Sequence, residues 1–427
     1  MDTKQSNRTR VWIFMLTTLL AGVVLIGGLI AALVARPRLG GHSTSQAQAQ
    51  LSETSFDFKE YRPPSASTVK TQDKVGWVYA NQHGFEWRGG HFNDHGGETV
   101  WSSDGRWIFM SERNRIMQIS VADGKGRFQT AFPSQFELFS SAVGPVLLFG
   151  DSGSSQPEPC GIAVLDADTL QIKHWHRLSV IGMYTSVDSS IAVIAARDTF
   201  YDYEDIIRMT SVGRWREKGK LLVVDLATGK IQASGLLRER IVTSGLRDTF
   251  RNHYSMRMAL TDGGRAIYTD GDLALIRYQV QGDQISFDQQ CDFPSSLAPN
   301  IAHWRGYIDI WGCTDDMILT NCGLVRTSNP TNILYTDVLA IAPGGWIYRR
   351  EESYAGSITS PDGKRSAPFR IPSSEPSLGT MFDDIAPAPA SLLPSFMTSR
   401  QNVAYIGLTP AAVEKLKSSA DNNPVKP

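Results

Sequence analysis

Residues 99–125 read TVWSSDGRWIFMSERNRIMQISVADGK, and they decide the fold that the sequence predicts. Short apolar runs are separated by tight turns, and the last run alternates apolar with polar residues, as a β-strand does. Asp104 with Gly105 and Asp123 with Gly124 mark the turns, because aspartate bonds to its own backbone and glycine accepts a positive φ without a Cβ clash. One unit of this kind cannot bury its own faces, so further copies are expected.

Copies of both turns recur along the chain. The first turn type returns, complete or degraded, at four places: residues 186–190, 261–265, 314–316 and 360–364. The second type ends a strand: residues 119–125 (ISVADGK) align with 224–230 (VDLATGK) and with 165–171 (LDADTLQ), which lacks the glycine. The three segments begin 46 and 59 residues apart, which fits a four-stranded unit of roughly 40–50 residues with insertions.

An S-x-D-G-R/K turn before an apolar strand, with a V-x-D-x-x-T-G-K strand end downstream, resembles the WD-type, YVTN-type and TolB-like β-propeller repeats of bacteria. The resemblance covers about residues 75–408 and identifies a class of repeat. It implies an all-β fold, a β-propeller of seven four-stranded blades at roughly 47 residues each, with six or eight blades as alternatives. Residues 402–408 would then pair with the first blade and close the ring, which removes exposed sheet edges.

The N-terminal region carries a long apolar segment. Residues 11–35, VWIFMLTTLLAGVVLIGGLIAALVA, contain no charge and as a helix would extend about 37 Å, longer than the roughly 30 Å hydrocarbon core of a bilayer. A cleaved signal peptide has a shorter apolar region and a small-x-small site directly after it, where this chain has Leu33. We therefore expect a retained transmembrane signal anchor, with a cleaved signal as the alternative.

These features divide the sequence into five parts. They are an N-terminal tail (1–10), a transmembrane helix (11–35), a flexible linker (36–74), the β-propeller (75–410) and a C-terminal tail (411–427). Basic residues flank the apolar segment on both sides, so the positive-inside bias is slight. A short N-terminal tail favours export of the larger part. We expect a single-pass protein of the bacterial inner membrane with its propeller outside the cytoplasm.

Charge and cysteine content limit the classes of partner and chemistry. The formal net charge of -1 argues against a nucleic-acid surface, which normally needs a basic excess. The four cysteines, at positions 160, 291, 313 and 322, fit no zinc or redox spacing. Two disulfides are possible outside the cytoplasm, where Cys313 and Cys322 could close a hairpin. Buried thiols are the alternative.

The weak candidates for metal ligands are His83, His91, Asp94 and His95, in the segment NQHGFEWRGGHFNDHGG. Imidazole and carboxylate groups suit zinc, but an i, i+4 pair such as His91 and His95 shares a face only on a helix, and this segment is rich in glycine. A polar loop that leads into the first blade is the simpler interpretation.

Other candidate chemistry is sparse. His174 and His176 would share one face of a strand, which an exposed strand face or strand end explains without a ligand. The sequence contains no nucleophile elbow, phosphate-binding loop, zinc-protease helix motif or dinucleotide fingerprint. Catalytic residues therefore remain unassigned, and no cofactor is indicated.

Two polar insertions interrupt the repeat, at residues 198–220, with room for a short helix, and at 246–258. Loops on one rim of a propeller usually carry binding. We therefore predict a membrane-anchored propeller that binds or scaffolds another protein through its rim loops, contacts lipid through residues 11–35 and binds no nucleic acid. The alternative is a propeller enzyme, namely a dehydrogenase, lyase or hydrolase that acts on a sugar or peptide over the central channel.

Overall fold

The chain forms two compact units, Met1–Asp57 and Phe58–Pro427, in the computed structural model. The structure describes parts of the second unit only: residues 67–70, 78–82, 85–91, 98–112, 114–149, 160–197, 214–243, 256–261, 263–271, 274–293, 310–352, 355–370, 384–389, 395–399 and 402–408. Among these residues there is no helix with the length and apolar character needed to cross a membrane. Residues 11–35, predicted to be the transmembrane helix, lie outside the described ranges.

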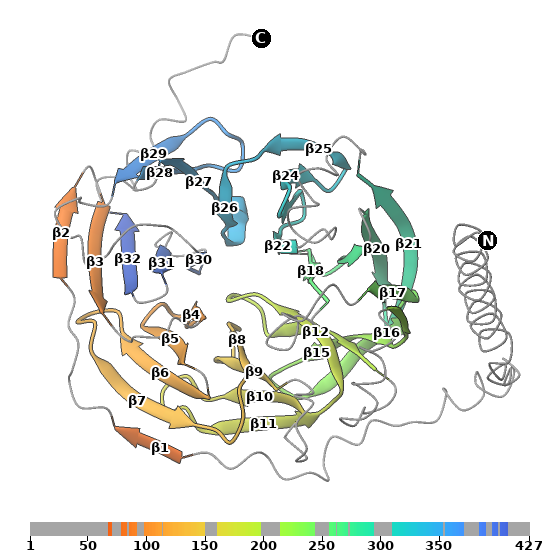
Figure 1. Ribbon diagram of the computed structural model, residues 1–427, viewed down its shortest axis with the longest axis horizontal. Coiled ribbons are helices and arrows are strands. Elements are labelled where there is room, and N and C mark those ends of the chain that lie inside the picture. The colour runs from red at the N-terminus through yellow and green to blue at the C-terminus, as the bar shows by residue number, and fades with distance from the viewer. Residues whose placement is uncertain are drawn as a thin grey trace, which may run out of the picture. The chain divides into compact units, whose positions relative to one another are not determined.

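The described strands form antiparallel sheets that stand around a common centre, with the first strand of each blade innermost (Figure 1). The innermost strands are β4 (Thr99–Trp101), β8 (Glu137–Phe139), β12 (Val180–Thr185), β18 (Met258–Leu260), β22 (Ile310–Cys313), β26 (Val338–Ile341) and β30 (Asp384–Pro387). Contacts join β30 to β4 and β4 to β8, and they join β12, β18, β22, β26 and β30 in succession. Sheets arranged radially in this way are a β-propeller, as predicted.

The first two sheets follow the chain. β4 is followed outward by β5 (Trp107–Glu112), β6 (Arg115–Ser120), β7 (Gly126–Ala131) and β1 (Ser67–Lys70). β8 is followed by β9 (Val146–Phe149), β10 (Gly161–Leu165) and β11 (Ile172–Arg177). β1 lies in the range that the sequence assigns to the linker, residues 36–74, and pairs with β7.

The next sheet has eight strands, because two four-stranded units join at their outer strands. One unit contains β12, β13 (Ile191–Ala196), β15 (Lys220–Asp225) and β16 (Lys230–Leu236). The other contains β18, β19 (Ala266–Gly271), β20 (Ala274–Gln281) and β21 (Gln284–Asp292). β16 and β21 run parallel where they meet, with Ser234 opposite Gln284. β14 (Arg214–Glu217) and β17 (Arg240–Thr243) form a separate pair of strands. β14 lies within residues 198–220, which the sequence predicts as an insertion with room for a short helix, so this part of the insertion is a strand instead.

The remaining sheets complete the ring. β22 is followed by β23 (Met317–Thr320), β24 (Gly323–Arg326) and β25 (Asn329–Tyr335). β26, with a short 3₁₀ turn at Pro343–Gly345, is followed by β27 (Ile347–Glu352), β28 (Ala355–Thr359) and β29 (Ser366–Arg370). The last sheet is β30, β31 (Ser395–Ser399), β32 (Asn402–Leu408), β3 (Phe85–His91) and β2 (Val78–Gln82).

Closure of the ring joins the two ends of the propeller in one sheet. β32 pairs antiparallel with β3 over its whole length, from Phe85 opposite Leu408 to His91 opposite Asn402. An N-terminal strand and the C-terminal strand thus supply neighbouring positions in the last blade. Residues 402–408 thus close the ring, as predicted, but their partner is an N-terminal strand within the last blade and not a strand of the first blade β4–β7.

The first turn type has the hydrogen bonds that its sequence predicts. The Gly105 amide donates to the Ser102 carbonyl (3.0 Å), while Asp104 Oδ1 accepts from the Ser102 hydroxyl (2.7 Å) and from the Arg106 amide (3.0 Å). Residues 360–365 repeat this pattern, with Asp362 in the place of Asp104. Asp104 therefore serves the turn, as its recurrence in the sequence indicates.

The second turn type shows what happens when its glycine is missing. Gly124 and Gly229 have φ values of 68° and 70°, and Leu170, which stands in the equivalent place, has φ 56°. A leucine in this left-handed region costs roughly 1–2 kcal/mol. The Leu170 side chain is fully buried, and burying a leucine contributes about 1.5–3 kcal/mol, which offsets the strain.

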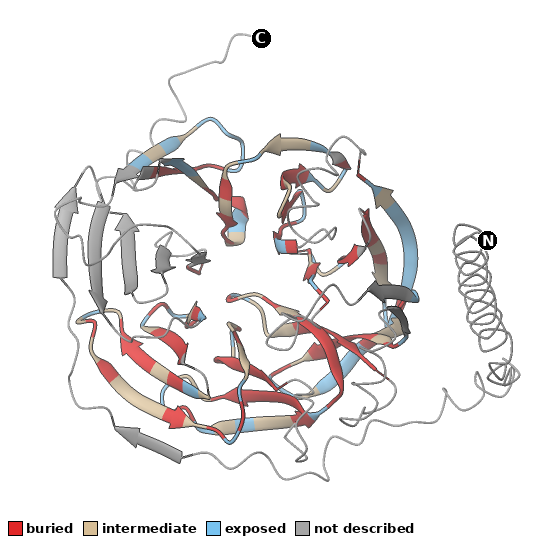
Figure 2. Ribbon diagram, in the orientation of Figure 1, coloured by how far each residue is buried: buried red, intermediate tan, exposed pale blue. Residues whose placement is uncertain are grey.

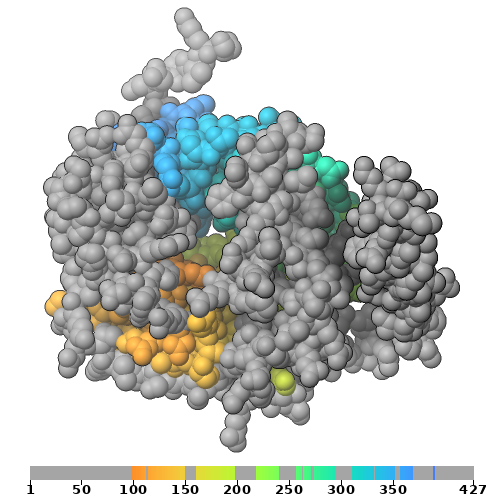
Figure 3. Space-filling model, viewed as in Figure 1, coloured from red at the N-terminus to blue at the C-terminus, as the bar shows by residue number. Residues whose placement is uncertain are grey.

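In the blades whose burial is described, burial falls from the middle strands toward the outer ones (Figure 2). All five residues of β10 are buried, whereas most residues of β21 are exposed. On the face drawn in Figure 3, residues of the sheet β4–β7 and of β26–β29 reach the surface on opposite sides of the middle. The core therefore lies between blades and within their middle strands.

The four cysteines, all in described segments, form no disulfide. Cys160 and Cys313 are buried, and Cys291 and Cys322 pack against the same apolar cluster as Cys313. Burial raises the pKa of the Cys291 thiol above its ordinary value. The structure thus contains thiols, the second of the two alternatives that the sequence leaves open.

Candidate interaction surfaces

Strand direction divides the connections between two rims of the propeller. Because neighbouring strands are antiparallel, the turn between the first and second strands of a blade and the turn between its third and fourth strands share one rim. The repeated Asp and Gly turns lie there, and we call it the turn rim. The other connections leave from the opposite rim, the insertion rim. The strand ends at the insertion rim flank residues 150–159, 198–213, 244–255 and 294–309.

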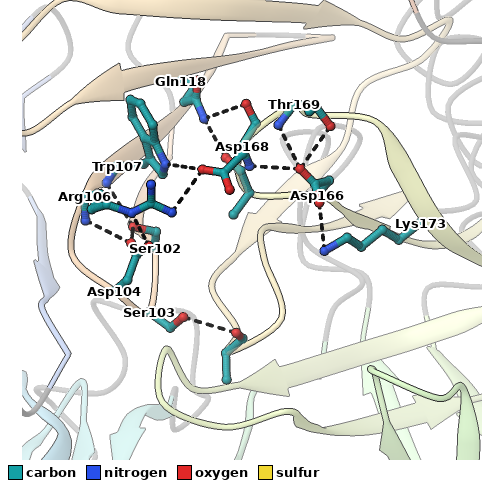
Figure 4. Close-up of polar contacts among 12 residues, drawn as sticks. Ser102, Ser103, Asp104, Arg106, Trp107, Gln118, Asp166, Asp168, Thr169 and Lys173 are labelled. Carbon is teal, nitrogen blue, oxygen red and sulfur yellow. Dashed lines mark hydrogen bonds and ion pairs between the residues drawn. The ribbon is translucent and has the colours of Figure 1, made fainter.

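At the turn rim, polar side chains of one sheet reach a turn of the next (Figure 4). Asp168 Oδ1 accepts hydrogen bonds from Trp107 Nε1 (3.0 Å) and Arg106 Nη2 (3.1 Å). The Gln118 side-chain amide donates to the carbonyl of Ala167 in the same turn. Arg106 also pairs with Asp104, so one guanidinium joins two turns. Both Asp168 and Arg106 are more than half exposed, so this contact positions the turns and contributes little to stability.

Asp166 anchors the turn that receives this contact. Its carboxylate accepts from the Lys173 ammonium (2.8 Å), from the Thr169 amide (2.9 Å) and from the Asp168 amide (3.0 Å). The hydrogen bond from Lys173 is the largest cause of a pKa of about 2 for Asp166, with the Thr169 bonds adding to it against some burial. The group is therefore ionised at neutral pH and holds the turn rather than exchanging protons.

Contacts between turns continue around the turn rim. The Ser103 hydroxyl donates to the Ala142 carbonyl (3.1 Å), and the Ala142 amide donates to the Ser189 carbonyl (2.9 Å). Farther along, the Gly263 amide donates to Asp315 Oδ1 (2.7 Å). Turns of the first three blades, and the turns at Gly263 and Asp315, are thus bonded to one another, so these polar groups already have partners within the propeller.

The outer face of the eight-stranded sheet carries exposed apolar side chains instead. Leu236 on β16 is 62% exposed and Phe287 on β21 is 48% exposed. The Arg238 guanidinium lies 4.8 Å from the centre of the Phe287 ring, which also packs edge-on against Tyr278. We call Leu236, Arg238 and Phe287 the outer patch. The outer patch is not among the predicted sites, although a lone aromatic residue in the polar strand QISFDQQCD is a usable signal for an exposed ring.

Two carboxyl groups, those of Glu98 and Glu137, lie at the starts of the innermost strands β4 and β8. Burial raises the pKa of Glu137 on β8, although the Arg257 guanidinium from another blade opposes this shift. On the neighbouring blade, the Glu98 carboxylate accepts a hydrogen bond from the Leu138 amide. Trp311, on β22, is 50% exposed. Within the described ranges no three histidine, cysteine, aspartate or glutamate side chains are grouped as metal ligands.

The predicted metal ligands are not brought together by any described contact. His91 is the last residue of β3, where its backbone faces Asn402, and its side chain is not described. His83, Asp94 and His95 lie outside the described residues. A metal site in this segment therefore stays a weak prediction.

His174 and His176 lie on β11 with nearly parallel rings, 6.4 Å between centroids, so they share a face as predicted. The exposed position expected for them is wrong for His176, which is buried against the turn of the next blade. A Cβ added to Gly229 in that turn would lie 2.7 Å from His176 Cε1. Burial, with a smaller contribution from the neighbouring His174, lowers the pKa of His176 to about 4. The imidazole is therefore a neutral packing group at neutral pH.

No family model matches the sequence, and a search of curated proteins finds no similar one. Solved structures do resemble the chain at low identity. A chain of "Crystal Structure of Mitotic Checkpoint Complex" is 9% identical with a TM-score of 0.43, covering 82% of this chain and 98% of its own length. The N-terminal domain of Nup159 is 8% identical with a TM-score of 0.39, covering 80% and 98%. The β-propeller domain of Myceliophteria thermophila Cps50 (Swd1) is 11% identical with a TM-score of 0.35, covering 80% and 99%.

Proposed function

We propose that this chain is a membrane-anchored β-propeller that binds another protein through the outer patch and the adjoining insertion rim. The outer patch carries the proposal. Leu236 and Phe287 stay exposed on two paired strands, while most described apolar side chains of the same blades are buried or half-buried, Ile231 (37% exposed) excepted. Covering apolar surface contributes about 25 cal/mol per Å², and aromatic and arginine side chains often dominate protein interfaces. The turn rim, whose polar groups bond to each other, offers less to a partner.

The anchor and the orientation belong to the same proposal. Residues 11–35 would cross the bilayer, residues 36–66 would space the propeller from it, and the propeller would lie outside the cytoplasm of a bacterial cell. The length and apolar character of residues 11–35 support the anchor. A reporter that is active only outside the cytoplasm, fused after Pro427, should be active. Activity of a cytoplasmic reporter at the same position would overturn the orientation.

We propose seven blades for this propeller. The support is the set of seven innermost strands, with the eight-stranded sheet counted as two blades and the closing sheet as one. A projection of the particle along the ring axis should then show sevenfold pseudo-symmetry, and six or eight lobes would correct the count.

Site-specific photocrosslinking tests the binding role. A photoreactive phenylalanine analogue is placed at Leu236, at Phe287 or, as a control, at the exposed turn residue Lys364 of the full chain in its own cells. We expect the first two positions to give the same discrete adduct and the control to give none. Absence of an adduct from both patch positions, or an identical pattern from all three, would contradict the proposal.

A further inference from the structure

A two-stranded ribbon continues the outer hairpin of one blade at the insertion rim. β15 and β16 end their pairing with Lys220 opposite Leu236. β14 and β17 then continue the same hairpin, from Glu217 opposite Arg240 to Arg214 opposite Thr243; Figure 1 shows β17 beside β16. Because these strands begin where the blade's own strands end, the ribbon extends beyond the blade.

The base of the ribbon is held firmly. The Leu237 amide donates to the Gly219 carbonyl (2.9 Å), and Leu237 is buried in the apolar cluster between the two joined blades. The Arg238 amide donates to the Tyr278 hydroxyl (3.0 Å). Gly219 leaves no room for a side chain, since a Cβ there would lie 2.3 Å from the Ala196 carbonyl oxygen. The ribbon therefore starts from a fixed position beside the outer patch.

The outer edges of the ribbon offer backbone groups for pairing. In the described part of the chain, β14 and β17 pair with each other and with no third strand. An unpaired strand edge presents a row of N–H and C=O groups that can accept an added strand. Extended peptides bind to many proteins in this way, with the backbone supplying affinity and alternate side chains supplying specificity.

Positive charge is concentrated along the ribbon and its base. Residues 214–220 and 238–243 contain two acidic residues, Glu217 and Glu239, and the six basic residues Arg214, Arg216, Lys218, Lys220, Arg238 and Arg240. The whole chain, by contrast, has a formal net charge of -1. Lys218 and Arg238 are exposed. A second copy of the ribbon would bring the same charges together, so pairing between copies is opposed by repulsion, whereas an acidic strand is attracted.

We propose that the β14–β17 ribbon takes up an acidic, extended segment of a partner protein as an added strand. This inference rests on the proposed function, because it names the class of partner segment that would bind beside the outer patch. Backbone pairing would hold the segment, and the basic excess of residues 214–220 and 238–243 favours carboxylates in it.

A synthetic peptide tests the proposal without knowledge of the partner. The probe is a fluorescent nonapeptide of alternating Glu and Val, titrated with the full chain in detergent. We expect binding that weakens roughly tenfold as salt rises from low to high ionic strength, because salt screens the attraction between the acidic peptide and the basic ribbon. A matched peptide with Lys in place of Glu should not bind.

Backbone methylation of the probe separates strand addition from simple charge attraction. In an added strand only alternate N–H groups face the ribbon. Methylation of one alternating set of amides should therefore reduce affinity at least tenfold, and methylation of the other set should change it less than threefold. Equal effects of the two sets would overturn strand addition, and so would absence of any binding by the Glu-Val peptide.

Charge reversal locates the binding to the ribbon. The variant Arg214→Glu/Arg216→Glu/Lys218→Glu/Arg240→Glu should bind the probe at least tenfold more weakly. A matched control reverses four exposed basic residues elsewhere on the propeller: Arg115→Glu, Arg326→Glu, Arg350→Glu and Lys364→Glu. The control should bind within twofold of the parent chain, and an equal loss in both variants would overturn the assignment. If the photocrosslinks at Leu236 and Phe287 persist while the ribbon variant binds the peptide normally, only this inference fails.

Discussion

Two junctions between blades of this propeller are held by different forces. Between the sheets β4–β7 and β8–β11, side chains reach across: the exposed Arg106 and the half-buried Trp107 both bond to Asp168. Between β16 and β21 the backbones themselves meet, and the Ser234 amide donates to the Asp283 carbonyl (2.9 Å). At the first junction, solvent-exposed polar contacts lie above a buried apolar cluster. At the second junction, the backbones of the two strands are in direct contact and leave almost no space for side chains.

The difference predicts where each junction is sensitive. Exposed ion pairs are screened and contribute roughly 0–1 kcal/mol, so the polar contacts of the first junction mainly position its turns. Closely packed backbones cannot accept extra atoms without moving. Substitutions should therefore damage the second junction through volume, and the first through its buried apolar residues more than through its charges.

The largest effect is expected for Gly235→Val in the second junction. A Cβ at Gly235 would lie 1.9 Å from the Ile285 carbonyl oxygen, a backbone atom that cannot rotate away. We expect a loss of about 3 kcal/mol or more in unfolding free energy, measured by denaturant titration of tryptophan fluorescence. Gly282→Ala is the control, because nothing lies within 4 Å of its Cβ position and its φ of 61° costs only about 1–2 kcal/mol. Equal losses in the two variants would show that the strands can separate freely.

Leu170→Ala should weaken the first junction next. The Leu170 side chain is fully buried with Phe149 and Leu147 in the cluster under that junction, so its truncation should cost about 2–4 kcal/mol. Leu170→Gly should be no worse than Leu170→Ala within about 1 kcal/mol, because glycine relieves the positive φ that alanine retains. A glycine variant much less stable than the alanine variant would mean that the backbone is not strained there.

A third junction gives an effect that depends on pH. The pKa of His176 in the folded chain is about 4, below its unfolded value of 6.5, so the unfolded chain takes up the proton first. The neutral His176 therefore makes its full contribution to the free energy of unfolding above about pH 6.5. This contribution, up to about 2–3 kcal/mol, is lost as the pH falls toward 4. His176→Met should flatten this part of the stability profile, while His174→Met should keep most of it. An unchanged slope in His176→Met would show that other groups cause the acid sensitivity.

Sequence alone predicted the features that depend on local chemistry. The aspartate and glycine turns recur because each blade needs the same backbone reversal, and the closing strand at residues 402–408 follows from the apolar pattern. Even the missing glycine at Leu170 marks a real copy of the turn, since that residue adopts the glycine conformation. Local patterns of this kind survive in each repeat, so they can be read without a structure.

The outer patch and the ribbon could not be predicted in the same way. The exposure of Phe287 follows from its place on an outer strand of two joined blades, and β16 and β21 meet between positions 234 and 284, far apart in sequence. The strand Arg214–Glu217 is flanked by Gly213, Lys218, Gly219 and Lys220, a composition that indicates a loop. It nevertheless pairs with β17, because the pairing of β15 with β16 aligns the two segments. Contacts between distant segments override the local preference at these places.

The smallest effect is expected at the polar contacts of the first junction. Asp168→Asn removes the ion pair with Arg106 while retaining an oxygen for Trp107 Nε1, so the free energy of unfolding should fall by about 0–1 kcal/mol at low salt. Because both charges are more than half exposed, this difference should shrink further in about 0.5–1 M salt, where the Debye length is short and the ion pair is screened.

Asp168→Ala also removes the acceptor for the Trp107 indole, so its loss should exceed that of Asp168→Asn and persist in salt. Denaturant titrations at two salt concentrations separate these parts. A loss above 2 kcal/mol for Asp168→Asn would mean that this junction, too, depends on its charges, and the contrast between the two junctions would no longer hold.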